Sequence, residues 1–278
     1  MLLLISGFIG QGMKVGDKMA TKERYIEKRK RIRKIKMKIS SILFAIVFIF
    51  WGIYYLLQSD IMNLKEIVVN GNEQVKVEEI INISNLVTNK NIFKYNLEEI
   101  ESTIETHAYI KDAKVGRKLP KTITIEVKER AEYAIIPYMG SYIYIDEENV
   151  ALRAGDSYIA NDHIIITGVE FKSFKTGEKI EAANDKALKS ALDILKAAKL
   201  TSIFDMISEI NISEENNIRL ITIDGGDVWL GEGKEPAYLM VALDEILINL
   251  YTKNIRNVVI DMRYEGNISV MDRNTWEE

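Results

Sequence analysis

The chain of 278 residues contains two histidines, His107 and His163, and no cysteine. Neither histidine lies in an HxxxH or HExxH spacing, which would place two ring nitrogens on one helix face for a metal ion. Without cysteine there is no thiolate ligand, no disulfide and no thiol nucleophile. We therefore expect both histidines to be surface or helix-capping residues, and we expect neither a metal site nor a cofactor.

One glycine-rich segment has the outline of a phosphate-binding loop. Gly226 and Gly231 are separated by four residues, but Glu232 follows where such a loop has its lysine. A carboxylate there would repel phosphate, so these glycines are predicted to be turn residues. The other carboxylates are scattered, and residues 146–148 are predicted to form a solvent-exposed turn. GxSxG, SxxK and GxGxxG are absent from the sequence, which favours a non-catalytic protein and leaves a glycosidase-type acid pair as an open alternative.

An uncharged apolar segment, Ile39–Leu57, stands out from the rest of the chain. Its 19 residues would span roughly 28 Å as a helix, close to the thickness of a bilayer's hydrocarbon core. A buried core helix would show a polar face, and a cleaved signal peptide would be followed by small residues at its cleavage site. We expect a transmembrane helix over residues 39–58, with Ile39, Phe44, Trp51 and Leu57 among its anchoring residues.

Charge is distributed unevenly around this segment. Residues 1–38 carry 12 Lys/Arg and 3 Asp/Glu, a balance of +9, and the remaining residues have a balance of −13. Positive charge beside a span stays in the cytoplasm, so residues 1–38 are predicted to be a cytoplasmic tail with the main mass outside. An acidic body argues against nucleic-acid binding. We assign no function to the residues before Lys22, and Met1, Met13 and Met19 remain alternative translation starts.

The segment after the span, residues 60–130, has the pattern of a β-α-α-β-β module. The turn pair Asn70-Gly71 closes the first strand, and Asn96 is a candidate N-cap for the second helix, with Glu99 at the capping-box position. Alternating apolar residues mark the last two strands. The expected elements are a strand over Leu64–Val69, helices over Val77–Ser84 and Leu97–Ile104, and strands over Ile110–Arg117 and Thr122–Lys128.

Residues 131–270 are predicted to form a second, β-rich domain with two longer helices, followed by a short tail over residues 271–278. Asn184 is a candidate N-cap for the first helix, and Pro236 sits in the first turn of the second. The expected strands are Ala134–Pro137, Tyr142–Ile145, Ile164–Thr167, Ile207–Ile212, Ile218–Ile223, Val228–Leu230 and Ile255–Met262, with Ile268–Val270 as an extension of the last. The fold class is α+β: one transmembrane helix, the small module, and a mixed, mostly antiparallel sheet domain.

Four stretches in this order carry a resemblance to a known family. They are Leu64–Asn72, the long strand-turn-strand Tyr109–Arg130, Tyr144–Asp146, and the late strand Val259–Tyr264. These four stretches follow a predicted transmembrane helix with the expected orientation. In this order they resemble the bacterial cell-division family FtsQ/DivIB. The resemblance implies that residues 60–130 are a POTRA module. It also implies a single-pass type II protein of the bacterial cell membrane, located at the division septum.

The resemblance further implies a scaffold of the divisome without enzymatic activity or a small-molecule substrate. Its partners would be FtsB/DivIC-like and FtsL-like membrane proteins, linked to septal peptidoglycan synthesis. A partner would add a strand to an exposed sheet edge near the C-terminus, a mode that exploits unpaired backbone groups. The matching positions are Arg263, Tyr264, Glu265, Ile268 and Val270.

Three alternatives stay open. Asp261 and Arg263 could form an ordinary solvated strand face. The protein could be a POTRA-containing envelope assembly or secretion factor, or an extracytoplasmic hydrolase.

Overall fold

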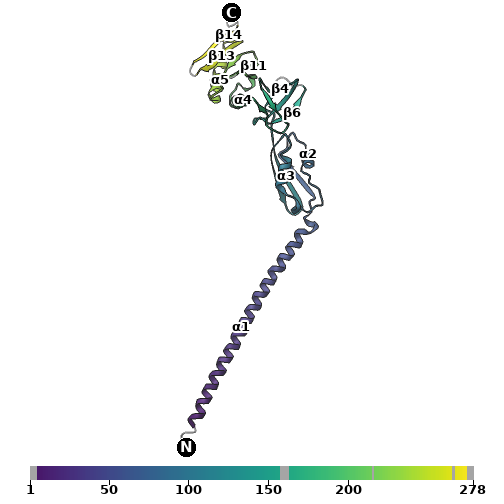
Figure 1. Ribbon diagram of the computed structural model, residues 1–278, viewed down its shortest axis with the longest axis vertical. Coiled ribbons are helices and arrows are strands. Elements are labelled where there is room, and N and C mark those ends of the chain that lie inside the picture. The colour runs from purple at the N-terminus through teal and green to yellow at the C-terminus, as the bar shows by residue number, and fades with distance from the viewer. Residues whose placement is uncertain (1–4, 157–162, 215, 265–266, 274–278) are drawn as a thin grey trace. The chain divides into compact units, whose positions relative to one another are not determined.

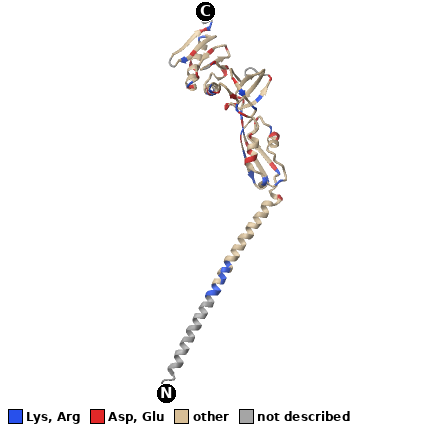
Figure 2. Cartoon of the chain, in the orientation of Figure 1, with Lys and Arg blue, Asp and Glu red and all other residues tan. Residues whose placement is uncertain are grey.

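The computed structural model describes residues 5–156, 163–214, 216–264 and 267–273 (Figure 1). The first helix, α1, runs over Ile5–Gln58. Within the described residues, its part Lys28–Gln58 is the one helix that is long and apolar enough to cross a membrane. Figure 2 shows Lys and Arg on the stretch that precedes the uncharged segment. The predicted anchoring residues Ile39, Phe44, Trp51 and Leu57 lie on this helix with exposed side chains.

The described residues divide into two compact units. One contains α1 and continues to Lys65, and it also includes Asn89–Lys94 and Leu119–Lys121. It holds two short 3₁₀ helices, η1 (Asp60–Met62) and η2 (Ile92–Lys94). The other unit contains every strand of the fold and all remaining helices.

The second unit begins with the β-α-α-β-β pattern that the sequence predicted. Its three-stranded sheet has the order β1-β3-β2, with β1 parallel and β2 antiparallel to the central β3. Helix α3 contacts β2, and α2 contacts both α3 and β1. The elements are β1 (Glu66–Asn70), α2 (Val77–Ile83), α3 (Leu97–Ile104), β2 (Ile110–Lys118) and β3 (Thr122–Glu129).

Two local predictions for this module have different outcomes. Gly71 has a φ of +84°, and a Cβ there would lie 2.2 Å from the carbonyl oxygen of Val127, so only glycine fits the turn. Asn96 occupies the N-cap position of α3, but its side chain makes no capping hydrogen bond. The predicted capping box between Asn96 and Glu99 is therefore wrong.

The rest of the second unit contains the predicted second domain, residues 131–270. It is built on a nine-stranded sheet with the order β14-β13-β12-β11-β10-β7-β4-β5-β6. Five of its eight neighbouring pairs are antiparallel and three are parallel. This confirms the predicted α+β class with a mixed, mostly antiparallel sheet. The strands are β4 (Ala134–Tyr138), β5 (Ser141–Ile145), β6 (Ala151–Gly155), β7 (Ile164–Thr167), β10 (Ile207–Glu214), β11 (Asn217–Thr222), β12 (Asp227–Trp229), β13 (Val258–Tyr264) and β14 (Asn267–Asp272).

Two helices, α4 (Asp185–Ala198) and α5 (Pro236–Thr252), supply the rest of the core. Their apolar side chains form one buried cluster with the inner face of the sheet. Pro236 begins α5, as the sequence predicted. The expected core face of α4 is confirmed, because Leu188, Ala191, Leu192 and Leu195 are all buried. A 3₁₀ turn, η3 (Phe204–Met206), and a two-stranded sheet, β8 (Phe171–Ser173) with β9 (Glu181–Ala182), complete the domain.

The C-terminal strands differ from the prediction. Strand β13 starts at Val258 rather than Ile255, because α5 ends at Thr252 and positive φ angles at Asn254 (55°) and Asn257 (53°) keep the residues between them out of the strand. Residues 268–270 do not extend β13, and this prediction is wrong. They belong to a separate strand, β14, that pairs antiparallel with β13 and continues to Asp272.

Candidate functional site

Strand β14 lies at one edge of the nine-stranded sheet, and no described strand pairs with its outer side. It carries two predicted partner-binding residues, Ile268 and Val270, which are 37% and 43% exposed. Tyr264, at the end of the neighbouring β13, is 64% exposed. The edge therefore offers unpaired backbone groups together with exposed apolar side chains. Glu265, the fifth predicted residue, lies outside the described residues.

The face of the sheet that these side chains join follows from the register. Val270 is opposite Ile260, a fully buried residue of the core that contains α4 and α5. Opposite residues of an antiparallel pair share a face, and so do residues two apart on one strand. Ile268 and Val270 therefore continue the core face beyond the last strand that the core covers.

A one-residue bulge interrupts the pairing of β13 and β14. Asp261 is opposite Ser269 and Tyr264 is opposite Asn267, so β13 has one more residue than β14 between these pairs. Bulges of this kind redirect the side chains of the strand that carries them. The backbone N–H of Arg263, within the bulge, donates to Asp261 Oδ1 at 3.0 Å instead of to a neighbouring strand.

Asp261 and Arg263 form a fixed pair. The Nε and Nη2 atoms of Arg263 donate to the two carboxylate oxygens of Asp261 at 2.9 and 2.6 Å. These hydrogen bonds lower the pKa of Asp261 against the opposing effect of burial, and they raise the pKa of Arg263. Asp261 is only 8% exposed. The alternative of an ordinary solvated strand face is therefore wrong for Asp261.

The Arg263 guanidinium also stacks on aromatic rings. Its Cζ lies 4.5 Å from the ring centre of Trp229 and 5.6 Å from that of Tyr264. A cation over an aromatic face is attracted by the ring's negative π surface. The carboxylate and the two rings hold the long arginine side chain in one orientation, which reduces the conformational entropy that a binding partner would have to remove.

A groove lies beside the hairpin of β13 and β14. It has a volume of about 630 Å³ and extends to the first turns of α5. Leu230, Leu239 and Met262 are its buried apolar lining, whereas Tyr264 and Ile268 are exposed at its side. Arg263 lines the same groove, so the structure gathers three of the predicted partner-binding residues on one concavity.

Both histidines lie away from this groove. The Nε2 atom of His107 is 3.3 Å from Glu79, and that of His163 is 3.6 Å from Glu132. Among the described residues, no group of three His, Asp or Glu side chains could hold a metal ion. The glycine-rich segment does contribute Gly231 to the groove, next to the carboxylate of Glu232.

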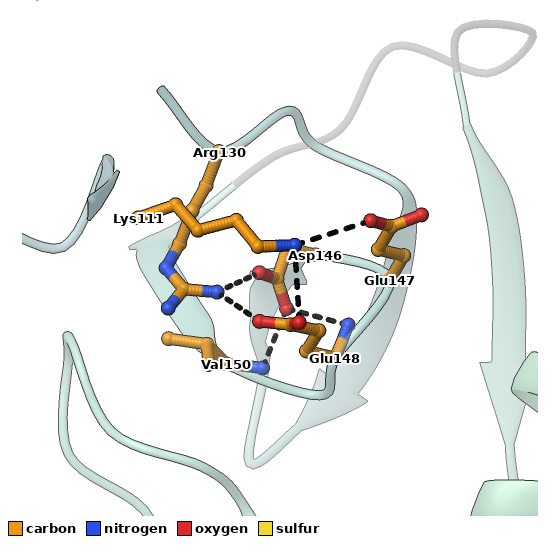
Figure 3. A network of polar contacts seen from close by, with 6 residues as sticks. All are labelled: Lys111, Arg130, Asp146, Glu147, Glu148 and Val150. Carbon is orange, nitrogen blue, oxygen red and sulfur yellow. Dashed lines mark hydrogen bonds and ion pairs between the residues drawn. The ribbon is translucent and has the colours of Figure 1, made fainter. Parts of the chain in front are cut away.

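Sequence reasoning missed a second site, where the β1–β3 module meets the nine-stranded domain. Figure 3 shows Arg130, directly after β3, with its guanidinium on the carboxylate of Asp146, the residue after β5. The other oxygen of Asp146 accepts the backbone N–H groups of Glu148 and Val150 at 2.9 and 2.8 Å. Asp146 is buried, so the prediction of an exposed turn is wrong for this residue.

The outer carboxylates of the same turn reach back to the module. Lys111, on β2, lies 3.4 Å from Glu147 and 3.0 Å from Glu148. Arg130 also donates to Glu148 at 2.8 Å. Hydrogen bonds from Arg130, and next from Lys111, lower the pKa of Glu148 to about 2. Opposite charges directly after β3 and β5 were the available signal for this contact.

Comparisons with known proteins cover both domains. A family model described as "POTRA domain, FtsQ-type" matches residues 62–130, and one described as "Cell division protein FtsQ/DivIB, C-terminal" matches residues 134–263. The chain is 31% identical over 172 residues to the cell division protein FtsQ of Syntrophotalea carbinolica, a match that covers 62% of this chain and 60% of the relative.

Two DivIB proteins are similar as well. The cell division protein DivIB of Clostridium tetani is 31% identical over 165 residues, which cover 57% of this chain and 60% of the relative. DivIB of Clostridium botulinum (strain Loch Maree) is 26% identical over 242 residues, which cover 87% of this chain and 91% of the relative. The chain thus spans about 60% of the length of the first two relatives and nearly all of the third.

Proposed function

This chain belongs to the FtsQ/DivIB family of bacterial cell-division proteins, and from that we propose that it is a membrane-anchored scaffold of the division machinery. In this proposal residues 39–58 cross the membrane, residues 1–38 are cytoplasmic, and residues 60–130 and 131–270 lie outside at the septum. The uncharged segment of α1 and the basic stretch before it support this topology.

The observation that carries the proposed scaffold role is the open edge of β14 beside the groove. A partner segment in extended conformation would pair with the backbone of β14, and β14 would then no longer be the edge strand of the sheet. Alternate side chains of that segment would then point to the face that holds Ile268 and Val270, next to the groove. The combination of a free edge with an adjacent groove, lined by both apolar and charged side chains, favours a protein partner over a small ligand.

The side chains at this edge have the chemistry of a binding hot spot. Tyr264 provides a large exposed aromatic surface, and Arg263 is already held in place by Asp261 and Trp229. Tyrosine, tryptophan and arginine dominate the energetics of most interfaces, where truncating one such residue costs about 2–4 kcal/mol. We propose that the partner is an FtsB/DivIC-like or FtsL-like protein in the same membrane, since tethering both chains raises their effective concentration.

The proposed interface is tested by replacing Ile268 with Lys in the full-length chain and co-purifying it with co-expressed FtsB/DivIC-like and FtsL-like proteins. We expect the complex to be lost, because the lysine ammonium would have to be desolvated against the groove. Ile223→Lys is a matched control, since Ile223 is an exposed isoleucine that does not line the groove. Equal recovery of partners with both variants would refute the interface.

The proposed cellular role is tested by depletion. Cells that lose the protein should grow as filaments with unfinished septa, and the Ile268→Lys variant should fail to restore division although it reaches the membrane. Normal septation after depletion would refute the role in division itself.

A further inference from the structure

The outer end of α1 is joined to two loops that are far from it in sequence. The side-chain amide of Asn91 donates to the carbonyl oxygen of Leu57 in the last turn of α1, at 2.7 Å. Leu64 N donates to the carbonyl oxygen of Lys90 at 2.9 Å, and Lys65 N to that of Lys121 at the same distance. Residues 59–65, 89–94 and 119–121 therefore lie in the same compact unit as the helix.

These bonds fix the depth of the loops if α1 crosses the membrane as proposed. Leu57 is the last residue of the uncharged segment, so its carbonyl lies at the boundary between hydrocarbon and headgroups. The headgroup layer on each side of a bilayer is about 5–8 Å thick. A loop that is hydrogen-bonded to Leu57 therefore lies within or directly above the headgroups of the outer leaflet.

The surface of the three segments has the composition of a lipid-binding face. Ile61, Phe93 and Leu119 have exposed apolar side chains, and Leu119 is 57% exposed. The exposed lysines of these segments are Lys65, Lys90, Lys94 and Lys121. Asp60 is their one acidic residue, so their net charge is +3. This is a local reversal of sign, since residues 39–278 together have a balance of −13.

We propose that residues 59–65, 89–94 and 119–121 form a lipid-contact patch that binds the anionic phospholipid headgroups of the outer leaflet. The proposal rests on the transmembrane anchor of the proposed function. Lysines near an anionic surface are attracted electrostatically, while exposed apolar side chains enter the boundary between headgroups and acyl chains. Because lysine stems are apolar, the four ammonium groups can reach phosphates without removing Ile61 and Leu119 from that boundary.

The occupant follows from the position of the patch as well as from its charge. The lysines are on segments whose backbone is bonded to residues 57–65, so a bilayer around α1 brings phosphates to them without any further association step. A soluble acidic protein would have to displace those headgroups first. The patch would then give the chain a second attachment to the membrane beside the helix.

A single fluorescent label tests this contact, because the chain has no cysteine of its own. Full-length Leu119→Cys, labelled with an environment-sensitive dye, is reconstituted into vesicles of phosphatidylcholine with or without phosphatidylglycerol. We expect the dye emission to shift to shorter wavelength and to be quenched by doxyl-labelled lipid, most strongly with phosphatidylglycerol. A label at Leu200→Cys, a site that is 87% exposed in the second domain, should remain in water.

Reversing the charge of two lysines of the patch provides a second test with the same label. Lys94→Glu with Lys121→Glu should remove the emission shift at Leu119→Cys, whereas the matched pair Lys172→Glu with Lys189→Glu should leave it unchanged. A chain retained in the vesicles at alkaline pH whose Leu119 label stays in water would overturn the patch alone. Release of the chain at alkaline pH would overturn the anchor and the patch together.

Discussion

Replacing Arg130 with methionine should destabilise the folded part of the chain that follows α1 by about 3 kcal/mol. The change keeps an unbranched side chain but removes the guanidinium that donates to Asp146. The Asp146 side chain is only 3% exposed, so water cannot replace the lost donor. Breaking a buried ion pair by removing one partner costs about 3–5 kcal/mol, and the two backbone donors that Asp146 keeps place the expected value at the low end.

The second carboxylate contributes little to this magnitude. Glu148 also loses a donor in Arg130→Met, but its side chain is 41% exposed and it keeps Lys111. Exposed pairs of this kind contribute about 0–1 kcal/mol. Lys111→Met is therefore the matched control, because it removes a cation that contacts only the exposed carboxylates of the same turn.

The measurement is thermal unfolding of the full-length protein in detergent, followed by circular dichroism. A loss of about 3 kcal/mol in a folded part of roughly 200 residues lowers the midpoint by about 6–12 °C. The double variant Arg130→Met with Asp146→Asn should be less destabilised than the sum of the two single changes, by at least about 1 kcal/mol. A midpoint for Arg130→Met no lower than that for Lys111→Met, or strict additivity in the double variant, would refute the reasoning.

Three further predictions concern stability and use the same assay. Gly71→Ala should destabilise by about 1–3 kcal/mol, because its Cβ would clash with the Val127 carbonyl; Gly140→Ala, at a similar positive φ in open space, should cost less. Because the folded-state pKa of Glu148 is depressed from 4.5 to about 2, its contribution is complete above pH 4.5 and is lost as pH falls toward 2; Glu148→Gln should remove this dependence. Glu129→Gln should cost about 1–2 kcal/mol, since the charged carboxylate accepts three backbone N–H groups; an unchanged midpoint would contradict this role.

The sequence was most informative where one residue type had a single physical role. Gly71 was predicted as a turn residue, and the contact with the Val127 carbonyl shows why no other residue fits. Apolar residues at helical spacing identified the buried face of α4, because packing against a sheet requires that stripe. Pro236 marked the start of α5 for the same kind of reason: its missing N–H has no partner at that position in any helix.

The candidate site was harder to predict because it depends on contacts between distant segments. Residues 268–270 have the composition of a strand, but only the turn before them decides whether they extend β13 or pair with it as β14. Asp261 looked like a residue of a polar face, and its burial follows from Arg263 bending back over Trp229 at the bulge. The number of residues between paired strands sets such a bulge, and no local pattern records it.

The groove could not be predicted for a related reason. Its lining comes from the loops that flank β11 and β12, from α5 and from the C-terminal hairpin, which meet only when the nine strands have their final order. Tyr264 and Ile268 were identified through resemblance to a family, whereas Leu230 and Leu239, which line the same groove, were predicted only as a strand residue and a helix residue. The sequence therefore predicted only the part of the groove that lies on the C-terminal strands, because that part alone resembles a known family.

The adjacent pair Glu129 and Arg130 shows how a short motif can connect two domains. The carboxylate of Glu129 accepts the N–H groups of residues 73–75, which closes the loop between β1 and α2 within the first module. Neighbouring residues of an extended chain point to opposite sides, so Arg130 is directed toward the turn after β5 in the second domain. Each side chain is thus held by its own partner, and the two contacts share one peptide unit. A change that loosens the Glu129 loop should therefore also weaken the Arg130–Asp146 pair, so Glu129→Gln and Arg130→Met should be less than additive.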